Sequence, residues 1–196
     1  MITNEARASR DPFARKVEEQ ASVMRDQVQH YLDRARMAAR VNVIGARTDV
    51  APAIESLARA MRRIYEDRGL AVEVDVAPAA RFRGERQDLE EMAGNLLDNA
   101  CKWASASVSI AAKAVHADGG IHRLRIIVDD DGPGLTPEER AEALRRGRRL
   151  DETRPGSGLG LSIVAELAEL YGGSFTLDTA PKGGLRAVLD LPGVGQ

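Results

Sequence analysis

The sequence predicts an α+β fold: a two-layer sandwich in which helices cover one face of a mixed sheet, preceded by a helix of the bundle type. Two observations support the sandwich. Segments whose apolar residues recur with a helical period alternate with segments of period two, and turn-length connections join them. A third observation, a heptad pattern near the start of the chain, predicts the separate helix. Hydrophobic residues make up 43% of the 196 positions, which suffices for a sizeable core.

Residues 14–40 contain neither Gly nor Pro and are expected to form a long helix. Its apolar residues recur at alternating spacings of four and three: Val17, Ala21, Met24, Val28, Tyr31, Ala35 and Ala38. This seam favours a bundle helix, and a helix lying on its own domain is the alternative. The heptad is lost around Gly45, so we place a domain boundary there, with a bundle segment over 1–44 and a compact domain over 45–196.

The compact domain is expected to begin with a helix and a strand. Pro52 suits a helical first turn, and a 3.6-residue apolar stripe continues from Ile54 to Tyr65. Gly69 follows as a C-terminal stop. Valines then alternate over residues 72–76 and indicate a strand.

Similar patterns predict the remaining elements of the domain. In chain order they are a helix over 88–104, strands over 108–112 and 122–129, a helix from Pro137, a helix over 158–171, and strands over 174–178 and 185–191.

Composition excludes several classes of function. The formal net charge is -2 and aromatic residues make up only 4%, so the chain lacks the basic, aromatic surface expected of a nucleic-acid partner. The single cysteine, Cys101, cannot form an internal disulfide and is best interpreted as a small buried side chain in a protein of a reducing compartment. No apolar run approaches the roughly 20 residues of a membrane span.

The predicted helix 88–104 carries three polar residues on one face. Asn95, Asn99 and Lys102 stand at i, i+4 and i+7, while the apolar side of the helix should pack on the sheet. Two carboxamides beside an ammonium suit a site where Mg²⁺ keeps most of its waters and takes one or two protein oxygens. Lys102 would be a point charge for phosphate. A solvated polar stripe is the alternative.

An acidic turn follows the predicted strand 122–129. Asp130 stands at the strand end, and Gly132 and Gly134 would let a backbone approach a flat ligand closely. A carboxylate in this position can accept a hydrogen bond from an exocyclic amino group such as that of adenine. An ordinary Asp-Gly or Pro-Gly turn is the alternative.

A glycine-rich segment, Gly156-Ser157-Gly158-Leu159-Gly160, opens the predicted helix 158–171. Backbone amides at a helix N-terminus, preceded by glycines, bind phosphate. An arginine-rich stretch lies between the acidic turn and these glycines: Arg145, Arg146, Arg148, Arg149 and Arg154. It suggests a lid over anionic phosphates, and a solvated charge run is the alternative.

In combination these motifs resemble the ATP-binding catalytic domain of bacterial sensor histidine kinases, within the gyrase, Hsp90 and MutL nucleotide-binding group. Among sensor kinases the chain most resembles the PhoQ type. The resemblance rests on Asn95-Leu-Leu-Asp-Asn-Ala-Cys-Lys102 and on Arg146-Gly147 leading into Asp151-Glu-Thr-Arg-Pro-Gly-Ser-Gly-Leu-Gly160. It implies a Bergerat-type ATP-binding fold for residues 45–196 and part of a dimerisation hairpin for residues 1–44.

The resemblance also implies a role for each motif residue. Asn99, supported by Asn95, would hold Mg²⁺, and Lys102 would contact phosphate, which makes these three the catalytic set. Asp130 would bind the adenine amino group, with Gly132 and Gly134 beneath the base and Trp103 at the border of the nucleotide. The phosphate end would be formed by lid arginines and by the glycine-rich segment: Arg148, Arg154, Gly156, Gly158, Leu159, Gly160 and Leu161.

By the same resemblance, the intact protein would be a homodimer through its bundle that binds ATP or ADP. It would pass the γ-phosphoryl group to a histidine and then to a response regulator receiver domain. In the hydrolytic relatives, the position that Asn95 resembles holds a glutamate that activates water. Because an amide has no useful basicity, we expect poor ATP hydrolysis. The chain lacks the acceptor pattern His-Glu/Asp-x-Lys/Arg-Thr-Pro. We therefore expect a cytoplasmic fragment, without membrane contact of its own, that binds Mg-ATP and does not phosphorylate itself.

Two alternatives stay open at this point: an anti-sigma-type serine kinase, and a non-catalytic ATP-binding module that controls a response regulator. Two departures from the family pattern also bear on the site. Residues 143–147 replace a lid segment that commonly contains phenylalanine, and Gly184-Leu185 stands where Gly-Thr is frequent. The second departure puts a water-mediated contact to the base in doubt.

Overall fold

The computed structural model describes residues 46–117, 121–144 and 159–194. The predicted helix over 14–40 and the boundary at Gly45 lie outside these ranges, so both stay predictions. Within the described ranges, no helix combines the length and the apolar character that a membrane crossing requires.

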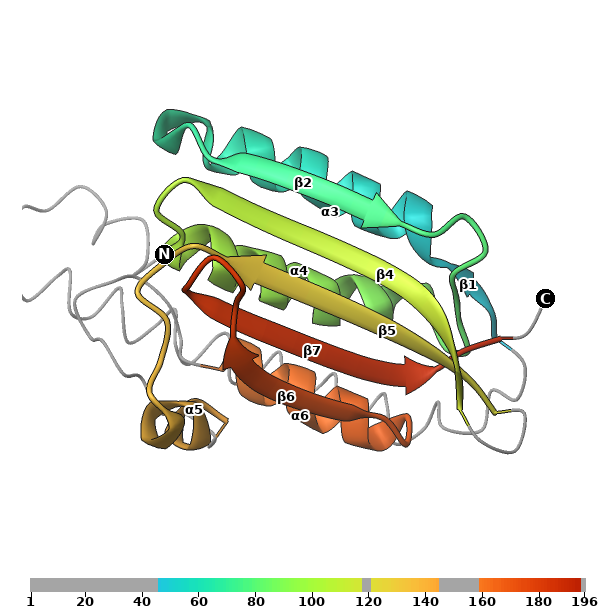
Figure 1. Ribbon diagram of the computed structural model, residues 1–196. Coiled ribbons are helices and arrows are strands. Elements are labelled where there is room, and N and C mark those ends of the chain that lie inside the picture. The colour runs from blue at the N-terminus through green and yellow to red at the C-terminus, as the bar shows by residue number, and fades with distance from the viewer. Residues whose placement is uncertain (1–45, 118–120, 145–158, 195–196) are drawn as a thin grey trace, which may run out of the picture. The chain divides into compact units, whose positions relative to one another are not determined.

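The domain is built on a five-stranded mixed sheet, as the sequence predicts (Figure 1). Its strands lie in the order β2-β4-β5-β7-β6. They comprise β2 Ala71–Val76, β4 Ser107–Ala117, β5 Ile121–Asp130, β6 Ser174–Thr179 and β7 Leu185–Pro192. The β2–β4 pair is parallel and the other neighbours are antiparallel. The parallel pair requires a crossover, which the helix between the two strands supplies.

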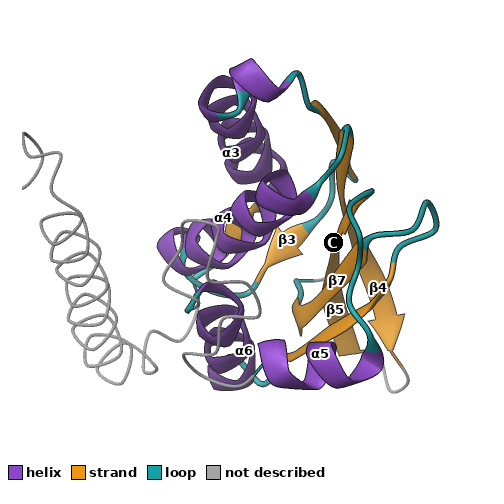
Figure 2. Cartoon of the chain, turned by 90° about the vertical axis from the view of Figure 1, so that its left-hand side faces the viewer, coloured by secondary structure: helices purple, strands orange, loops and turns teal. Residues whose placement is uncertain are grey.

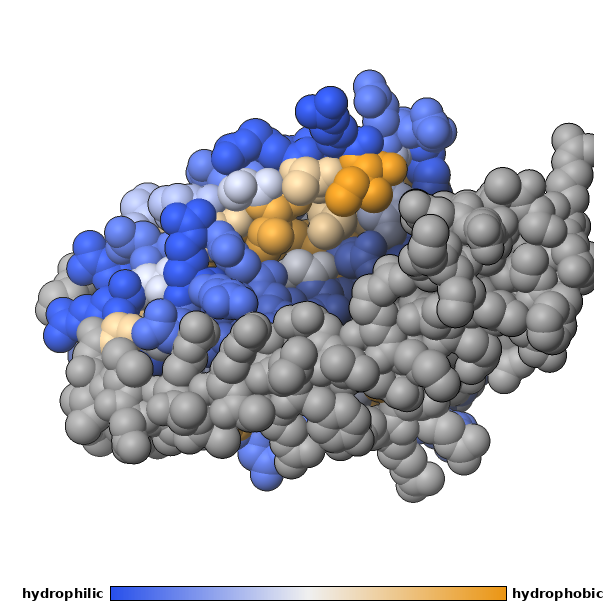
Figure 3. Space-filling model, turned by 180° about the vertical axis from the view of Figure 1, so that it is seen from behind, coloured by the Kyte–Doolittle hydropathy of each residue, from blue (hydrophilic) through white to orange (hydrophobic). Residues whose placement is uncertain are grey.

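Three helices cover one face of this sheet (Figures 1 and 2). They are α3 Val50–Ile64, α4 Arg86–Trp103 and α6 Gly160–Leu170, and the α+β sandwich is thereby confirmed. A short helix, α5 Pro137–Ala143, follows β5 and begins with a capping box between Thr136 and Glu139. From the helix side, the part of the described surface that is visible is largely hydrophilic and includes a hydrophobic patch (Figure 3).

Strict alternation along the strands decides which side chains face the helices. In β5, Leu124, Ile126 and Val128 are almost fully buried, and Asp130 continues the same register. Because successive side chains of a strand point to opposite faces, the carboxylate of Asp130 is directed to the helix side and that of Asp129 to the open side. The period of the strand therefore places the acidic residue at the edge of the core.

The apolar side of α4 lies in this core as expected. Its buried apolar residues are Leu89, Met92, Ala93, Leu96, Leu97, Ala100 and Cys101. Burial raises the pKa of the Cys101 thiol to about 11, and the nearby Asp98 adds to this shift. The thiol therefore stays protonated at neutral pH, which confirms the interpretation of Cys101 as a small buried side chain.

The structure differs from the predicted elements in several places. Strands β4 and β5 are longer than expected, because pairing with neighbouring strands extends them through an alanine-rich segment whose own pattern is weak. A two-stranded sheet of β1 Thr48–Asp49 and β3 Arg81–Phe82 was not predicted, since such short strands leave no periodic signal. Helix α6 begins at Gly160, two residues later than expected. Gly69 does end its helical region, in the left-handed conformation.

Candidate nucleotide site

The polar face of α4 meets the N-terminus of α6. Asn95 Nδ2 donates a hydrogen bond to the carbonyl oxygen of Glu91 at 2.9 Å, which leaves Oδ1 as an acceptor. A Cβ atom placed on Gly160 would lie 2.9 Å from this Oδ1, so the glycine lets the two helices approach without displacing the Asn95 amide. Two motifs 65 positions apart in the sequence, from Asn95 to Gly160, are thus brought together, as the predicted site requires.

The first turn of α6 is a candidate for binding an anion. Leu159 is the N-cap residue of the helix, and its own side chain makes no capping hydrogen bond. The hydroxyl group of Ser162 donates to the carbonyl oxygen of Leu159 at 2.9 Å and so does not compete for those amides. Leu159 is buried and Leu161 half-buried, so the backbone rather than these side chains would face a ligand. The backbone amides at a helix N-terminus and the helix dipole favour negative charge.

Four residues of the predicted phosphate end lie outside the described ranges: Arg148, Arg154, Gly156 and Gly158. Their roles stay predictions. Asn99 and Trp103 are half-buried on α4, as a residue bordering a ligand would be, and within the described ranges Asn99 makes no side-chain hydrogen bond.

Asp130 is the most buried charged group of the site, with 4% of its surface exposed. One carboxylate oxygen, Oδ1, accepts hydrogen bonds from the backbone amides of Gly132 at 2.8 Å and Leu185 at 3.2 Å. Among the residues described here, no donor reaches the other oxygen, Oδ2. Burial raises the pKa of Asp130 above its ordinary value, and the two amide bonds oppose that shift. The group is therefore fixed in orientation with one acceptor oxygen left over.

Glycines allow the backbone segments around Asp130 to approach one another. A Cβ atom on Gly132 would collide with the carbonyl oxygen of Trp103, and one on Gly184 would collide with the carbonyl oxygen of Asp130. Gly134 adopts a left-handed φ of 70°, and its Cβ would lie 3.0 Å from the carbonyl oxygen of Gly184. The sequence analysis assigned Gly132 and Gly134 to the close approach of a ligand. The structure gives each of them a packing reason as well.

Sequence reasoning missed Asp131, which fastens the acidic turn to the end of α4. Its carboxylate accepts hydrogen bonds from the amides of Ser105 at 2.8 Å and Ala106 at 3.0 Å, and from the amide and hydroxyl of Ser107. Burial alone would raise its pKa, but the bonds from Ala106, Ser107 and Ser105 lower the pKa to about 2. An aspartate just before a glycine turn gave no signal of this long-range role.

Sequence reasoning also missed the partner of Lys102. Its ammonium Nζ lies 2.6 Å from Asp98 Oδ2, one helical turn earlier. Asp98 Oδ1 accepts a hydrogen bond from the hydroxyl group of Tyr65 at 2.7 Å. The spacing of i and i+4 could have identified the ion pair, because such residues are neighbours on a helix. The tyrosine, 33 residues away in the sequence, could not have been found in this way.

The donor set fits a magnesium ion that arrives with a nucleotide. No group of three or more His, Cys, Asp or Glu side chains that could hold a metal occurs in the part of the chain that the structure describes. The oxygen that α4 presents toward α6 belongs to a carboxamide, Oδ1 of Asn95. Mg²⁺ binds in this manner where phosphates supply the remaining ligands.

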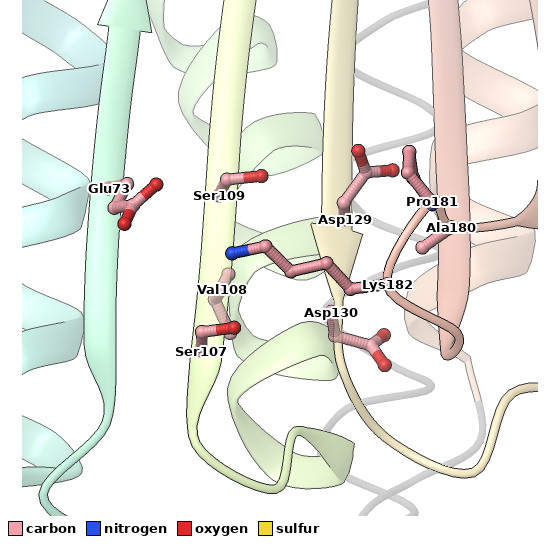
Figure 4. A pocket seen from close by; sticks show the side chains of 9 residues that line it. All are labelled: Glu73, Ser107, Val108, Ser109, Asp129, Asp130, Ala180, Pro181 and Lys182. Atoms are coloured by element: carbon pink, nitrogen blue, oxygen red, sulfur yellow. The ribbon is translucent and has the colours of Figure 1, made fainter.

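A cavity of about 90 Å³ on the open face of the sheet is distinct from this site (Figure 4). Its lining includes Glu73, Ser109 and Asp129, and the side chain of Lys182 crosses it. Arg186 forms two hydrogen bonds of 2.8 Å with Asp129. Asp130 also borders this cavity, but alternation along β5 directs its carboxylate to the helix side. The α4, α6 and Asp130 groups therefore form the candidate site.

Comparison with known proteins identifies a matching family and close relatives. Residues 84–194 match the family model described as histidine kinase-, DNA gyrase B-, and HSP90-like ATPase. The sensor protein kinase CarS of Pseudomonas aeruginosa is 40% identical in an alignment of length 192 that covers 94% of this chain and 41% of the relative. The sensor protein PhoQ of Escherichia coli is 36% identical over 168 residues, which are 86% of this chain and 34% of the relative. The chain thus spans about a third to two fifths of these relatives.

Solved structures share the fold. The ATP-binding domain of PrrB from Mycobacterium tuberculosis is 30% identical with a TM-score of 0.62, and the match covers 78% of this chain and 99% of that one. The mycobacterial sensor histidine kinase MprB is 29% identical with a TM-score of 0.66, covering 77% and 100%. Full-length ShkA, solved in complex with AMPPNP, is 26% identical with a TM-score of 0.74, covering 94% and 39%.

Proposed function

Since the chain belongs to the histidine kinase-, DNA gyrase B-, and HSP90-like ATPase family, we propose that it binds Mg-ATP and acts as the catalytic part of a sensor histidine kinase. The γ-phosphoryl group of ATP would go to a histidine on a dimerisation helix and from there to a response regulator. The names of the relatives, which are sensor kinases, support this reaction.

The observation that carries the proposal is the geometry of Asp130. A buried carboxylate is costly unless its oxygens are satisfied. Two backbone amides satisfy Oδ1, and within the described ranges Oδ2 has no hydrogen-bond donor. The exocyclic amino group of adenine is such a donor, and a charge-assisted hydrogen bond to it would discriminate against a base that presents an oxygen at that position.

The phosphates would lie between α4 and α6. The first turn of α6 offers backbone amides, and Lys102 offers a positive charge on α4. Asn99 and Asn95 would hold Mg²⁺ through their amide oxygens. When bound, the ion would neutralise the charge of the phosphates and help to orient the γ-phosphoryl group.

The residue at position 95 favours transfer over hydrolysis. An amide cannot take a proton from water at neutral pH, and Asn95 Nδ2 is already engaged with the carbonyl oxygen of Glu91. The site would therefore position ATP and await an acceptor from outside the domain. Catalysis would come from orientation and electrostatics, as is usual for phosphoryl transfer.

Isothermal titration calorimetry with ATP, with and without Mg²⁺, tests the binding step. Asp130→Asn keeps the shape of the side chain but puts an amide NH₂ in place of Oδ2, so that two donors face each other. We expect ATP affinity to fall by about tenfold or more, since an unmatched buried donor costs roughly 1–3 kcal/mol. Asp129→Asn, whose side chain faces the open side of the sheet, is the matched control. Equal affinities for wild type and Asp130→Asn would refute the base site.

The transfer step needs a separate assay. The chain is incubated with γ-labelled ATP and a separately prepared helical hairpin that carries the acceptor pattern His-Glu/Asp-x-Lys/Arg-Thr-Pro. Acid-labile, base-stable label on the hairpin is the expected result. Acid-stable label would indicate a serine kinase instead, and ATP binding without any transfer would indicate a non-catalytic module.

A further inference from the structure

Asp98 links the proposed phosphate-binding lysine to the C-cap residue of α3, Tyr65. Its Oδ2 lies 2.6 Å from Lys102 Nζ, and its Oδ1 accepts the hydroxyl hydrogen of Tyr65 at 2.7 Å. The side chains of Asp98 and Lys102 are 38% and 32% exposed, so the ion pair is partly shielded from water. Both oxygens of the carboxylate are thereby engaged, one by Lys102 of α4 and one by Tyr65, the C-cap residue of α3.

The position of Asp98 on α4 draws Lys102 away from the amide residues. At about 100° per residue, Asn99 lies about 60° to one side of Lys102 and Asp98 about 40° to the other. An ammonium held by Asp98 therefore leans to the flank opposite Asn99. Phosphate oxygens that share a magnesium ion with Asn99 would lie on the Asn99 side, and Lys102 would have to turn toward them.

Tyr65 keeps Asp98 in this arrangement. Burial raises the pKa of the tyrosine hydroxyl, and its hydrogen bond to Asp98 adds to the shift, so the hydroxyl remains a donor at physiological pH. Nearby, Arg68 donates to the carbonyl oxygens of Lys102 at 3.1 Å and Ala104 at 2.6 Å, and also to that of Cys101. The end of α3 and the residues after it thus hold both the backbone of α4 and the carboxylate beside Lys102.

We propose that Asp98, oriented by Tyr65, is a positioning residue that competes with phosphate for the ammonium group of Lys102 and so limits the affinity for the triphosphate. The inference rests on the proposed function, because it assigns Lys102 to phosphate. After the transfer a kinase must release the product ADP, and product release limits the turnover of many enzymes. A competing carboxylate on the same helix would keep that step fast.

Asp98→Asn tests the competition, because the amide can still accept from Tyr65 but carries no charge to hold Lys102. We expect its affinity for ATP to rise about two- to fivefold, the range that a partly exposed ion pair can contribute. Its affinity for adenosine, which has no phosphate, should not change. The matched control is Glu90→Gln, which removes the same kind of pair elsewhere on α4, where Glu90 Oε1 lies 2.7 Å from Arg86.

The double variant Asp98→Asn/Lys102→Ala shows whether the effect passes through the lysine. In the Lys102→Ala background we expect Asp98→Asn to leave the affinity for ATP unchanged. The inference would be overturned if Asp98→Asn raised the affinity for ATP equally in the Lys102→Ala background, or raised the affinity for adenosine. An equal gain in ATP affinity by Glu90→Gln would also overturn it, because the effect would then not depend on Lys102. Unchanged or weaker ATP binding by Asp98→Asn would overturn this inference and leave the proposed function standing. Failure of the wild type to bind ATP would overturn the proposed function and this inference together.

Discussion

Replacing Gly184 with alanine should weaken both the fold and nucleotide binding, because the hairpin between β6 and β7 lies directly against Asp130. Gly184 has a φ of 72°, a conformation that alanine rarely adopts. Its new Cβ atom would collide with the carbonyl oxygen of Asp130 and lie 2.6 Å from Asp130 Oδ1. The neighbouring Leu185 donates its amide to that same oxygen at 3.2 Å, so the carboxylate cannot move without losing the bond.

The size of the effect follows from two separate costs. Holding alanine in a left-handed conformation costs about 1 kcal/mol. Forcing extra volume into a packed site adds about 1–3 kcal/mol. We therefore expect Gly184→Ala to lower the free energy of unfolding by about 2–4 kcal/mol. Because the clash displaces the carboxylate that would read the base, ATP affinity should fall by about tenfold or more.

Gly183→Ala is the matched control for the conformational cost. Gly183 has a φ of 84°, also left-handed, but nothing lies within 4 Å of its added Cβ atom. It should lose only about 1 kcal/mol of stability and bind ATP like the wild type. Urea denaturation gives the stabilities and calorimetry the affinities. If the two alanine variants had the same stability and the same affinity, the contact between Gly184 and Asp130 would not govern the site.

Two further predictions concern stability. Arg68→Met should lower the free energy of unfolding by about 1–2 kcal/mol, because the carbonyl groups at the end of α4 lose a charged donor. Urea titration measures this loss. Arg63→Met, at an exposed arginine in the last turn of α3, is the control and should have little effect. Asp131, with its pKa lowered to about 2, stabilises the fold above the pKa of an unfolded aspartate, and this contribution should be lost as the pH falls from about 4 toward 2. The difference in unfolding free energy between wild type and Asp131→Asn should accordingly shrink between pH 7 and pH 3. A constant difference would count against the role of the three amides, and Asp75→Asn, at an exposed aspartate of β2, is the control.

Periodicity in the sequence was sufficient to predict the main elements of the sandwich. The 3.6-residue stripe from Ile54 to Tyr65 and the alternation over 72–76 became α3 and β2, and the mixed sheet followed from the order of elements. The same periodicity brought Asn95 and Lys102 to the polar face of α4. These features depend on neighbours within one or two turns or on alternate strand positions, which a sequence displays directly.

Contacts between distant segments could not be predicted in this way. Leu185 reaches Asp130 across 55 residues, and Tyr65 reaches Asp98 across 33. The sequence predicts that Leu185 costs the site a water-mediated contact to the base, because its side chain cannot hold a water molecule. The structure shows that its backbone amide contributes to the site whatever the side chain is. Sequence patterns report side-chain types, so a contribution made by a backbone atom leaves no trace in them.

The burial of Asp130 has opposite effects on the stability of the fold and on nucleotide binding. Because its pKa is raised in the folded state, its contribution to stability is fully present below the pKa of an unfolded aspartate and is lost as the pH rises through the folded value. Above that pH the fold carries a buried negative charge, and the amide donors found in the described part of the chain satisfy one of its two oxygens. A bound adenine amino group would stabilise the charged form through the second oxygen and offset this cost. The same carboxylate that makes the empty domain less stable would thus make the nucleotide complex selective, which explains why a buried aspartate is suited to this position.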